Sequence, residues 1–294
     1  MLIWTAIIRP LVAITVLALL SSCSAVKLAY TNLPELGYWW IDGYADLGDS
    51  QSVQLRADLT GLQEWHRATE LIKAADLLQQ ISRNAQSDTT AQQVCRLFDQ
   101  VRERVDAVRV QSEPTAVLLA MSLSPTQIGH MESKLEKGNA EWRRKWATGD
   151  RAERQKKRVE ASVERAEQFY GTLDDRQRAV LRAGMAASSF DPQRSFAQRL
   201  RRQQDLLQTL RTLSGANGTG KPTVAQAGAM LSAYLDRAVQ SPDPAYQAYA
   251  QAAIQDSCQT YAQLHNSTNA QQRTRAIARF AAYERDAREL ARQP

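Results

Sequence analysis

The sequence contains few of the residues from which metal and nucleophilic sites are built. It has three histidines and three cysteines in 294 residues. His66, His130 and His265 are far apart, and none belongs to an H-E-x-x-H pattern, which argues against a zinc site. There is no G-x-S-x-G nucleophile elbow and no C-x-x-C motif. We therefore expect no catalytic residues, no metal and no cofactor, and we predict that the protein is not an enzyme.

Phosphate-binding loops and β-strands are also missing. Gly215, Gly218, Gly220 and Lys221 lie close together, but their spacing does not fit a Walker motif and no strand precedes them. The stretch 214–222 is better interpreted as a flexible loop. No segment shows the alternation of period two that strands require, so the sequence predicts an all-α protein.

The N-terminus has the features of a bacterial lipoprotein leader. Residues 11–20 are apolar, which suits a signal peptide but is too short for a membrane span of about 20 residues. Leu20, Ser21 and Ser22 precede Cys23, as in a lipobox, where small residues admit the peptidase and the thiol accepts a diacylglyceryl group. We expect residues 1–22 to be a cleaved signal peptide and Cys23 to carry lipid, palmitate included. The alternatives are an uncleaved anchor and a chance cysteine after an ordinary signal.

This leader predicts where the protein works. Ser24, rather than Asp, follows the cysteine, which favours the periplasmic face of the outer membrane, with the inner membrane as the alternative. The membrane, reached through the lipid anchor, is then one partner, and the compartment argues against nucleic acid. The formal net charge is +6, but acidic residues are interspersed with the basic ones, as on a mixed solvated surface.

The remaining two cysteines, Cys95 and Cys258, are free to pair once Cys23 carries lipid. An oxidising compartment favours disulfides, so we predict a Cys95–Cys258 bridge across most of the chain. The alternative is two unrelated buried thiols.

Helical periodicity and turn residues divide the mature chain. Residues 23–48 form an aromatic-rich tether segment, whose Tyr and Trp side chains we expect to pack on the body; the alternative is that they lie on the membrane surface. A helical body over 49–213, the loop 214–222 and C-terminal helical hairpins over 223–294 follow. The expected multi-helix bundle has about nine or ten helices, at 50–84, 90–112, a short one after Pro114, 125–147, 150–170, 175–187, 192–213, 223–240, 243–265 and 269–291.

Five predicted helices start with one local pattern, in which a capping residue is followed three residues later by glutamine. This is the spacing of a capping box, in which the two residues satisfy each other's backbone N–H groups. The five pairs are Thr89 with Gln92, Ser124 with Gln127, Asp174 with Gln177, Thr223 with Gln226, and Thr268 with Gln271.

The most distinctive predicted surface is a basic patch with two tryptophans. Trp142 and Trp146 are four residues apart, hence on one face of a helix, and Arg143, Arg144 and Lys145 lie between them. Such a patch can bind anionic lipid, lipopolysaccharide phosphate, peptidoglycan carboxylates or an acidic protein. The alternative is Arg–Trp packing within a solvated helical pair.

Several motifs together resemble a family of uncharacterised proteobacterial lipoproteins. They are the lipobox and residues 38–42, 65–67, 123–127, 139–143, 164–167 with 170–171, 190–192 and 201–207. The resemblance implies an α-helical lipoprotein and supplies no activity. Residues 123–127 and 173–177 also resemble the paired LTxxQ motifs of small helical periplasmic chaperones, and a more distant likeness to lipase foldases exists.

The sequence thus predicts a membrane-anchored lipoprotein on the periplasmic side with a binding or scaffolding role. Its partner would be an envelope polymer or protein. The alternative is a chaperone-like holdase or foldase for periplasmic clients.

Overall fold

The computed structural model describes residues 26–218 and 220–293, and this part of the chain is all-α, without a strand. Residues 26–31 are helical. The longer helices are α2 (Leu33–Ala45), α3 (Asp49–Asn84), α4 (Ala91–Ser122), α5 (Pro125–Trp146), α6 (Arg151–Tyr170), α7 (Asp175–Ala187), α8 (Pro192–Leu213), α9 (Val224–Val239), α10 (Pro244–Asn266) and α11 (Ala270–Ala291). Most of these bounds lie within a residue or two of the expected ones, because capping residues, Pro and Gly mark the helix ends.

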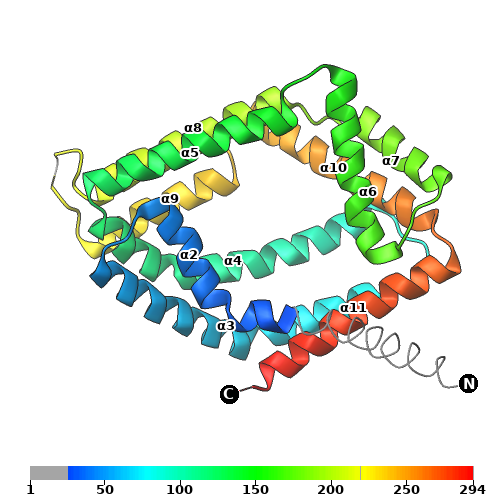
Figure 1. Ribbon diagram of the computed structural model, residues 1–294, viewed down its shortest axis with the longest axis horizontal. Coiled ribbons are helices and arrows are strands. Elements are labelled where there is room, and N and C mark those ends of the chain that lie inside the picture. Colours follow the sequence, from blue (N-terminus) through cyan, green and yellow to red (C-terminus); the bar gives the residue numbers. More distant parts are fainter. Residues whose placement is uncertain (1–25, 219, 294) are drawn as a thin grey trace, which may run out of the picture.

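The helices are arranged as a flattened ring (Figure 1). α5 and α8 pack along one long side, and α3, α4 and α11 run along the other. α6, α7 and α10 close one end, while α2 and α9 lie at the opposite end. Each of the three C-terminal helices packs on two helices that precede it: α9 on α4 and α8, α10 on α4 and α7, and α11 on α3 and α6.

Most of the buried apolar residues in the described ranges fall into three clusters instead of one continuous core. The largest joins α4, α5, α8 and α9 around Leu123, Ile128 and Leu213. A second joins α6, α7 and α10 around Leu181 and Leu264. A third lies between α3 and α11. Because no cluster fills the whole frame, several side chains between the clusters are left to line cavities.

The expected break at Pro114 is wrong, since α4 runs through it from Ala91 to Ser122. A proline inside a helix removes the hydrogen bond to the carbonyl four residues earlier, here that of Val110. Both residues are exposed, so water can hydrate that carbonyl. Beyond the proline, Val117 and Ala120 are buried in the largest cluster and hold the helix in place.

The segment before α3, predicted to be a tether, contains the helix α2. Pro34 falls in its first turn, where a missing N–H breaks no helical bond. A Cβ added at Gly37 would lie 3.6 Å from Leu59, an ordinary van der Waals distance, so α2 lies against α3 at this point. Gly48 caps α3. α2 packs on α3 and α5 and is part of the frame.

The capping boxes are present, but two start one residue later than expected. α4 is capped by Thr90 with Gln93, and α11 by Asn269 with Gln272. In both places two capping residues stand in succession, each followed three residues later by glutamine, so the sequence does not distinguish the two registers. The boxes at Ser124, Asp174 and Thr223 lie where predicted.

The capping glutamines also interlock in pairs across the ring. At one end, Gln177 Nε2 donates to Gln272 Oε1 at 2.6 Å and Gln272 Nε2 returns a bond to Gln177 Oε1 at 2.9 Å. Gln177 further donates to the Ser267 carbonyl, and Gln272 to the Thr172 carbonyl.

The other end repeats this arrangement. Gln127 Nε2 donates to Gln51 Oε1 at 2.7 Å and to the Asp46 carbonyl, while Gln51 Nε2 donates to the Ser122 carbonyl. In each of these four bonds from a glutamine to a carbonyl, the carbonyl belongs to the residue two positions before the N-cap of the partner glutamine's helix. The two LTxxQ-like segments therefore do not pair with each other, because each has a partner elsewhere in the chain.

Replacing Gln177 with alanine is expected to lower the free energy of unfolding by about 2–3 kcal/mol. The change removes a helix cap and leaves the buried amide of Gln272 short of a partner. Gln226→Ala is the matched control, because Gln226 caps α9 in the same way but is exposed. It should cost no more than about 1 kcal/mol. Urea unfolding compares the two variants, and equal losses would contradict the importance of the interlock.

Candidate functional site

A cavity with a volume of about 700 Å³ lies between α3, α4, α6, α10 and α11. We call it the chamber. Its walls are mainly apolar and include two aromatic pairs. Phe169 stacks on Phe280 with centroids 5.0 Å apart, and Phe98 meets Tyr261 edge to face at 6.3 Å. A volume of this size is typical of ligand-binding clefts.

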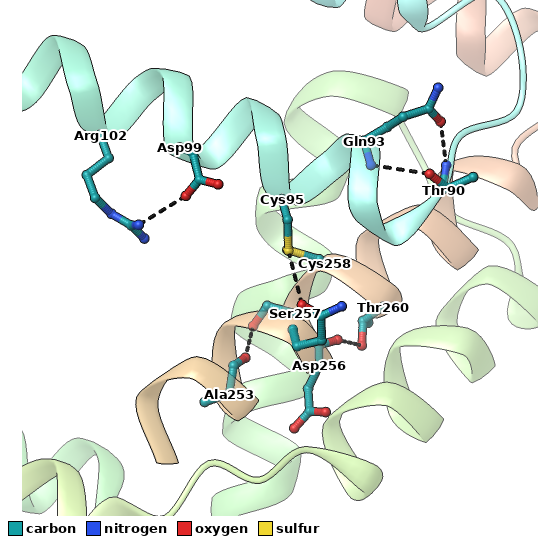
Figure 2. The surroundings of a disulfide bond; sticks show 11 residues. Thr90, Gln93, Cys95, Asp99, Arg102, Ala253, Asp256, Ser257, Cys258 and Thr260 are labelled. Atoms are coloured by element: carbon teal, nitrogen blue, oxygen red, sulfur yellow. Dashed lines mark hydrogen bonds and ion pairs between the residues drawn. A yellow bond between two sulfur atoms is a disulfide. The ribbon is translucent and has the colours of Figure 1, made fainter. Parts of the chain in front are cut away.

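The disulfide fixes two walls of the chamber. Cys95 of α4 and Cys258 of α10 are joined, with their Cα atoms 5.5 Å apart, as Figure 2 shows. Leu97 and Phe98, which follow Cys95, line the chamber, as does Ser257 beside Cys258. The cysteines that the sequence pairs therefore stand next to the cavity.

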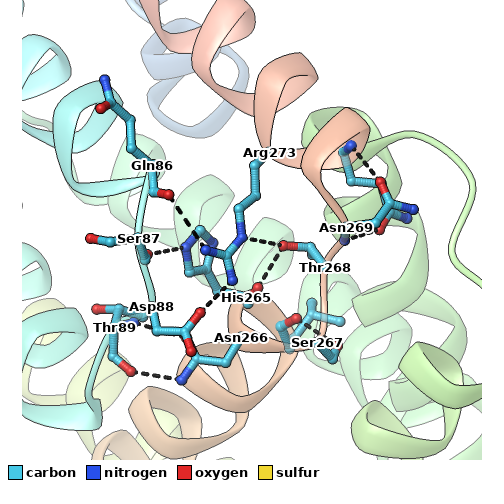
Figure 3. A network of polar contacts seen from close by, with 12 residues as sticks. Gln86, Ser87, Asp88, Thr89, His265, Asn266, Ser267, Thr268, Asn269 and Arg273 are labelled. Carbon is cyan, nitrogen blue, oxygen red and sulfur yellow. Dashed lines mark hydrogen bonds and ion pairs between the residues drawn. The ribbon is translucent and has the colours of Figure 1, made fainter.

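A polar network holds a third wall (Figure 3). His265 of α10 uses both ring nitrogens, since Nε2 donates to the Ser87 carbonyl at 2.9 Å and Nδ1 accepts from Tyr170 Oη at 2.9 Å. Arg273 pairs with Asp88. Burial lowers the pKa of His265 and raises the pKa of Tyr170 to about 12, so both side chains are neutral near pH 7.

Four arginines of α6 lie on one face of the helix. Arg151, Arg154, Arg158 and Arg165 are separated by three, four and seven residues, the spacing of neighbours along one helical stripe. None of the four has a carboxylate partner in the described part of the chain. The opposite face of α6 carries glutamates, of which Glu167 pairs with Arg178. The helix thus separates its charges, and we call its basic side the arginine stripe.

The arginine stripe runs along two smaller cavities that continue from the chamber. The first, of about 300 Å³, shares Arg165, Ser257 and Tyr261 with the chamber. The second, of about 280 Å³, shares Trp146, Arg158, Met185, Ser188 and Phe190 with the first. The three form one trough, apolar at the chamber and lined by arginine and tryptophan beyond it.

Arg158 is a half-buried charge in the trough. Its guanidinium donates to the Met185 carbonyl at 3.3 Å and to Ser188 Oγ at 3.0 Å, and it lies 4.6 Å from the Phe190 ring centroid. Burial lowers its pKa without making the group neutral. Two neutral acceptors use only part of the donor fork of an arginine, so this cation is available for an anion that enters the trough.

The predicted patch on α5 is only partly in this site. Trp142 and Trp146 line the trough. Arg143 lies 4.9 Å from the Phe196 ring centroid and Lys145 lies 4.9 Å from that of Trp146, and neither lines any of the three cavities. Arg144 is exposed. The cations that line the trough together with the tryptophans come instead from α6, and the helical spacing of its arginines is the signal that identifies them.

The aromatic residues of α2 divide between core and surface. Tyr38 is buried, as expected, and donates to Ser52 Oγ at 3.1 Å. The expectation of packing is wrong for Trp39 and Trp40, which are 64% and 68% exposed. Leu33 and Leu36 are also exposed, so the outward face of α2 is apolar. The reason is geometric, because α2 turns only one face to α3 and α5.

Other sequence predictions fall outside these features. Leu20, Ser21, Ser22 and Cys23 precede the described residues, so the structure gives no account of the lipobox. Among residues 26–218 and 220–293, no group of His, Cys, Asp or Glu is placed to hold a metal. Within the same ranges, no helix has the length and hydropathy to cross a membrane.

Comparison with known proteins yields one match. Residues 43–218, which extend from the end of α2 through α8, match a family described as a family of unknown function (DUF6279). The match includes the arginine stripe and both tryptophans of the trough but not α10 or α11, which complete the chamber. No curated protein and no solved structure matches the chain.

Proposed function

The chain belongs to the family of unknown function DUF6279, and we propose that it is a lipid-anchored protein of the cell envelope that binds an envelope component in its trough. It acts on the periplasmic face of the outer membrane, the location that Ser24 after Cys23 favours, and it is not an enzyme. The trough is the observation that carries the binding role. It combines a cavity with two tryptophans and an arginine stripe that has no acidic partner.

The exposed face of α2 supports the membrane location. Leu33 follows Cys23 by ten residues, a distance that a fully extended chain spans in at most about 35 Å. A lipid on Cys23 would therefore keep α2 close to the bilayer surface. Trp39 and Trp40 are residues that favour the interface between lipid and water. The one glutamate in the first turn of this helix, Glu35, is paired with Arg56.

Charge reversal on the arginine stripe tests the binding role. The full chain, purified in detergent, is applied to beads that carry peptidoglycan, anionic phospholipid or lipopolysaccharide. We expect wild type to be retained on one of these and Arg151→Glu with Arg154→Glu to bind at least about tenfold more weakly, since charge-assisted contacts are lost.

Arg143→Glu with Arg144→Glu is the matched control. It makes the same change of charge on exposed residues of the neighbouring helix that do not line the trough. Retention of wild type on none of the materials, or equal loss in both double variants, would contradict a binding role for the trough.

A second candidate function is a holdase or foldase for periplasmic clients. One observation favours it: Phe98, Val101 and Val105 of α4 are exposed and follow one helical stripe that begins in the chamber. Such an apolar stripe can hold an unfolded segment. Suppression of client aggregation that is lost in Val101→Asp with Val105→Asp, but kept in the Arg151 and Arg154 variant, would favour this function over the first.

A further inference from the structure

We propose that the trough binds an anionic amphiphile, with its acyl chain in the chamber and its phosphate or carboxylate head on Arg165 and Arg158. This inference rests on the proposed binding function and names the class of ligand that the site takes. It follows from the order in which apolar walls and unpaired cations occur along the trough.

The chamber has the lining that an acyl chain requires. Val94, Leu97 and Phe98 of α4 line it together with Phe169, Phe280 and Tyr261, around a volume of about 700 Å³. The stacked Phe169–Phe280 pair joins α6 to α11, and the Phe98–Tyr261 pair joins α4 to α10. The aromatic pairs and the nearby disulfide therefore fix the positions of the walls, and an acyl chain that enters removes apolar surface from water.

The joint between the chamber and the first smaller cavity supplies the position of the head group. Arg165 lines both cavities and is exposed, and its only described contact is a bond from Nε to the carbonyl of Ala161. Arg158 lies two turns earlier on the same face and has only neutral acceptors. A purely apolar ligand would leave both guanidinium groups without an anionic partner, whereas an anionic head group forms charge-assisted hydrogen bonds with them.

The acids near the joint do not compensate for these arginines. Glu160, Glu164 and Glu167 lie on the other side of α6, around a surface hollow toward α7 that shares only Gln168 with the chamber. On the α10 side, Asp256 accepts a hydrogen bond from the Ser189 N–H. Charge complementarity therefore selects an anionic amphiphile over a neutral or cationic one.

Displacement of a fluorescent fatty acid tests this proposal. The full chain is kept in a steroid-based detergent, which has no acyl chain, and cis-parinaric acid is titrated to saturation. Palmitate, lysophosphatidylglycerol and neutral 1-hexadecanol are then used as competitors. We expect both anions to displace the probe, and hexadecanol to do so about tenfold more weakly. The tighter of the two anions identifies the carboxylate or the phosphate as the preferred head.

Single substitutions assign the two ends of the ligand. Arg165→Gln should weaken the binding of both anions about five- to tenfold and leave the binding of hexadecanol unchanged, because only the contact with the head group is lost. Gln168→Trp, at an exposed position that lines the chamber, should weaken all three competitors. Arg176→Gln, an exposed arginine of α7 outside the trough, should change none of them.

Three results would overturn the proposal: no saturable binding of the probe, equal displacement by palmitate and hexadecanol, or equal effects of Arg165→Gln and Arg176→Gln. Retention on peptidoglycan beads without probe binding would overturn the ligand class alone and leave the proposed binding function standing. Loss of both would overturn the two together.

Discussion

Replacing Cys95 and Cys258 with serine is expected to lower the free energy of unfolding by about 4–5 kcal/mol in the chain-entropy account. The bridge closes a loop with a sequence separation of 163 residues, so its removal releases a large amount of freedom in the unfolded chain. It also joins α4 to α10 beside the chamber, where the core is divided into separate clusters.

Urea unfolding measures this loss. Wild type treated with a reductant should unfold at the same urea concentration as the double variant, and the reductant should have no further effect on that variant. On a gel without reductant, wild type should run faster than Cys95→Ser because the bridged chain is more compact when denatured. Identical unfolding curves for oxidised and reduced wild type would contradict the structural role of the bridge.

The second large effect is expected from Cys23→Ala, which should move the protein out of the membrane fraction. Acyl chains contribute about 0.8 kcal/mol for each buried methylene, and a mature lipoprotein carries more than one chain. Trp39 and Trp40 can supply only weak residual adhesion, which Trp39→Ser with Trp40→Ser should remove. Fractionation of cells measures the distribution, and intact mass measures the lipid.

Ser24→Ala is the control, because it changes the neighbouring residue and keeps the thiol. It should leave the protein in the membrane fraction with the mass of the lipid attached. If Cys23→Ala stays membrane-bound and wild type carries no lipid mass, the uncleaved anchor is the correct interpretation and the lipobox is not used.

The helical plan could be predicted because its signals are local. Asp150 and Asp174 cap α6 and α7, and Gly149 and Gly171 separate the helices with left-handed backbone angles that suit glycine. The same reasoning failed at Pro114, where the outcome depended on distant packing of Val117 and Ala120. Local propensity predicts that a proline destabilises the helix. Whether the helix nevertheless continues depends on how well the residues beyond the proline pack in the core.

The candidate site was harder to predict because it is built from segments far apart in the chain. Trp142 and Trp146 are visible in the sequence, but their neighbours Arg143 and Lys145 do not line the trough, whereas Arg158 and Arg165 do. The partner of Gln177 is Gln272, and nothing in the sequence around either residue indicates the other. Spacing along one helix predicts which of its residues share a face. Which helix lies opposite that face is known only from the fold.

The central claim, that the trough holds an envelope component, is tested most directly by crosslinking in living cells. A photoreactive amino acid is placed at Gln168, beside the chamber, and in a matched strain at Gln259, an exposed residue of α10 that does not line the trough. We expect the Gln168 position to capture a discrete amphiphile or envelope polymer that the Gln259 position does not, and Arg165→Gln to reduce the yield. Identical products from the two positions, or capture of unfolded polypeptides alone, would contradict the account.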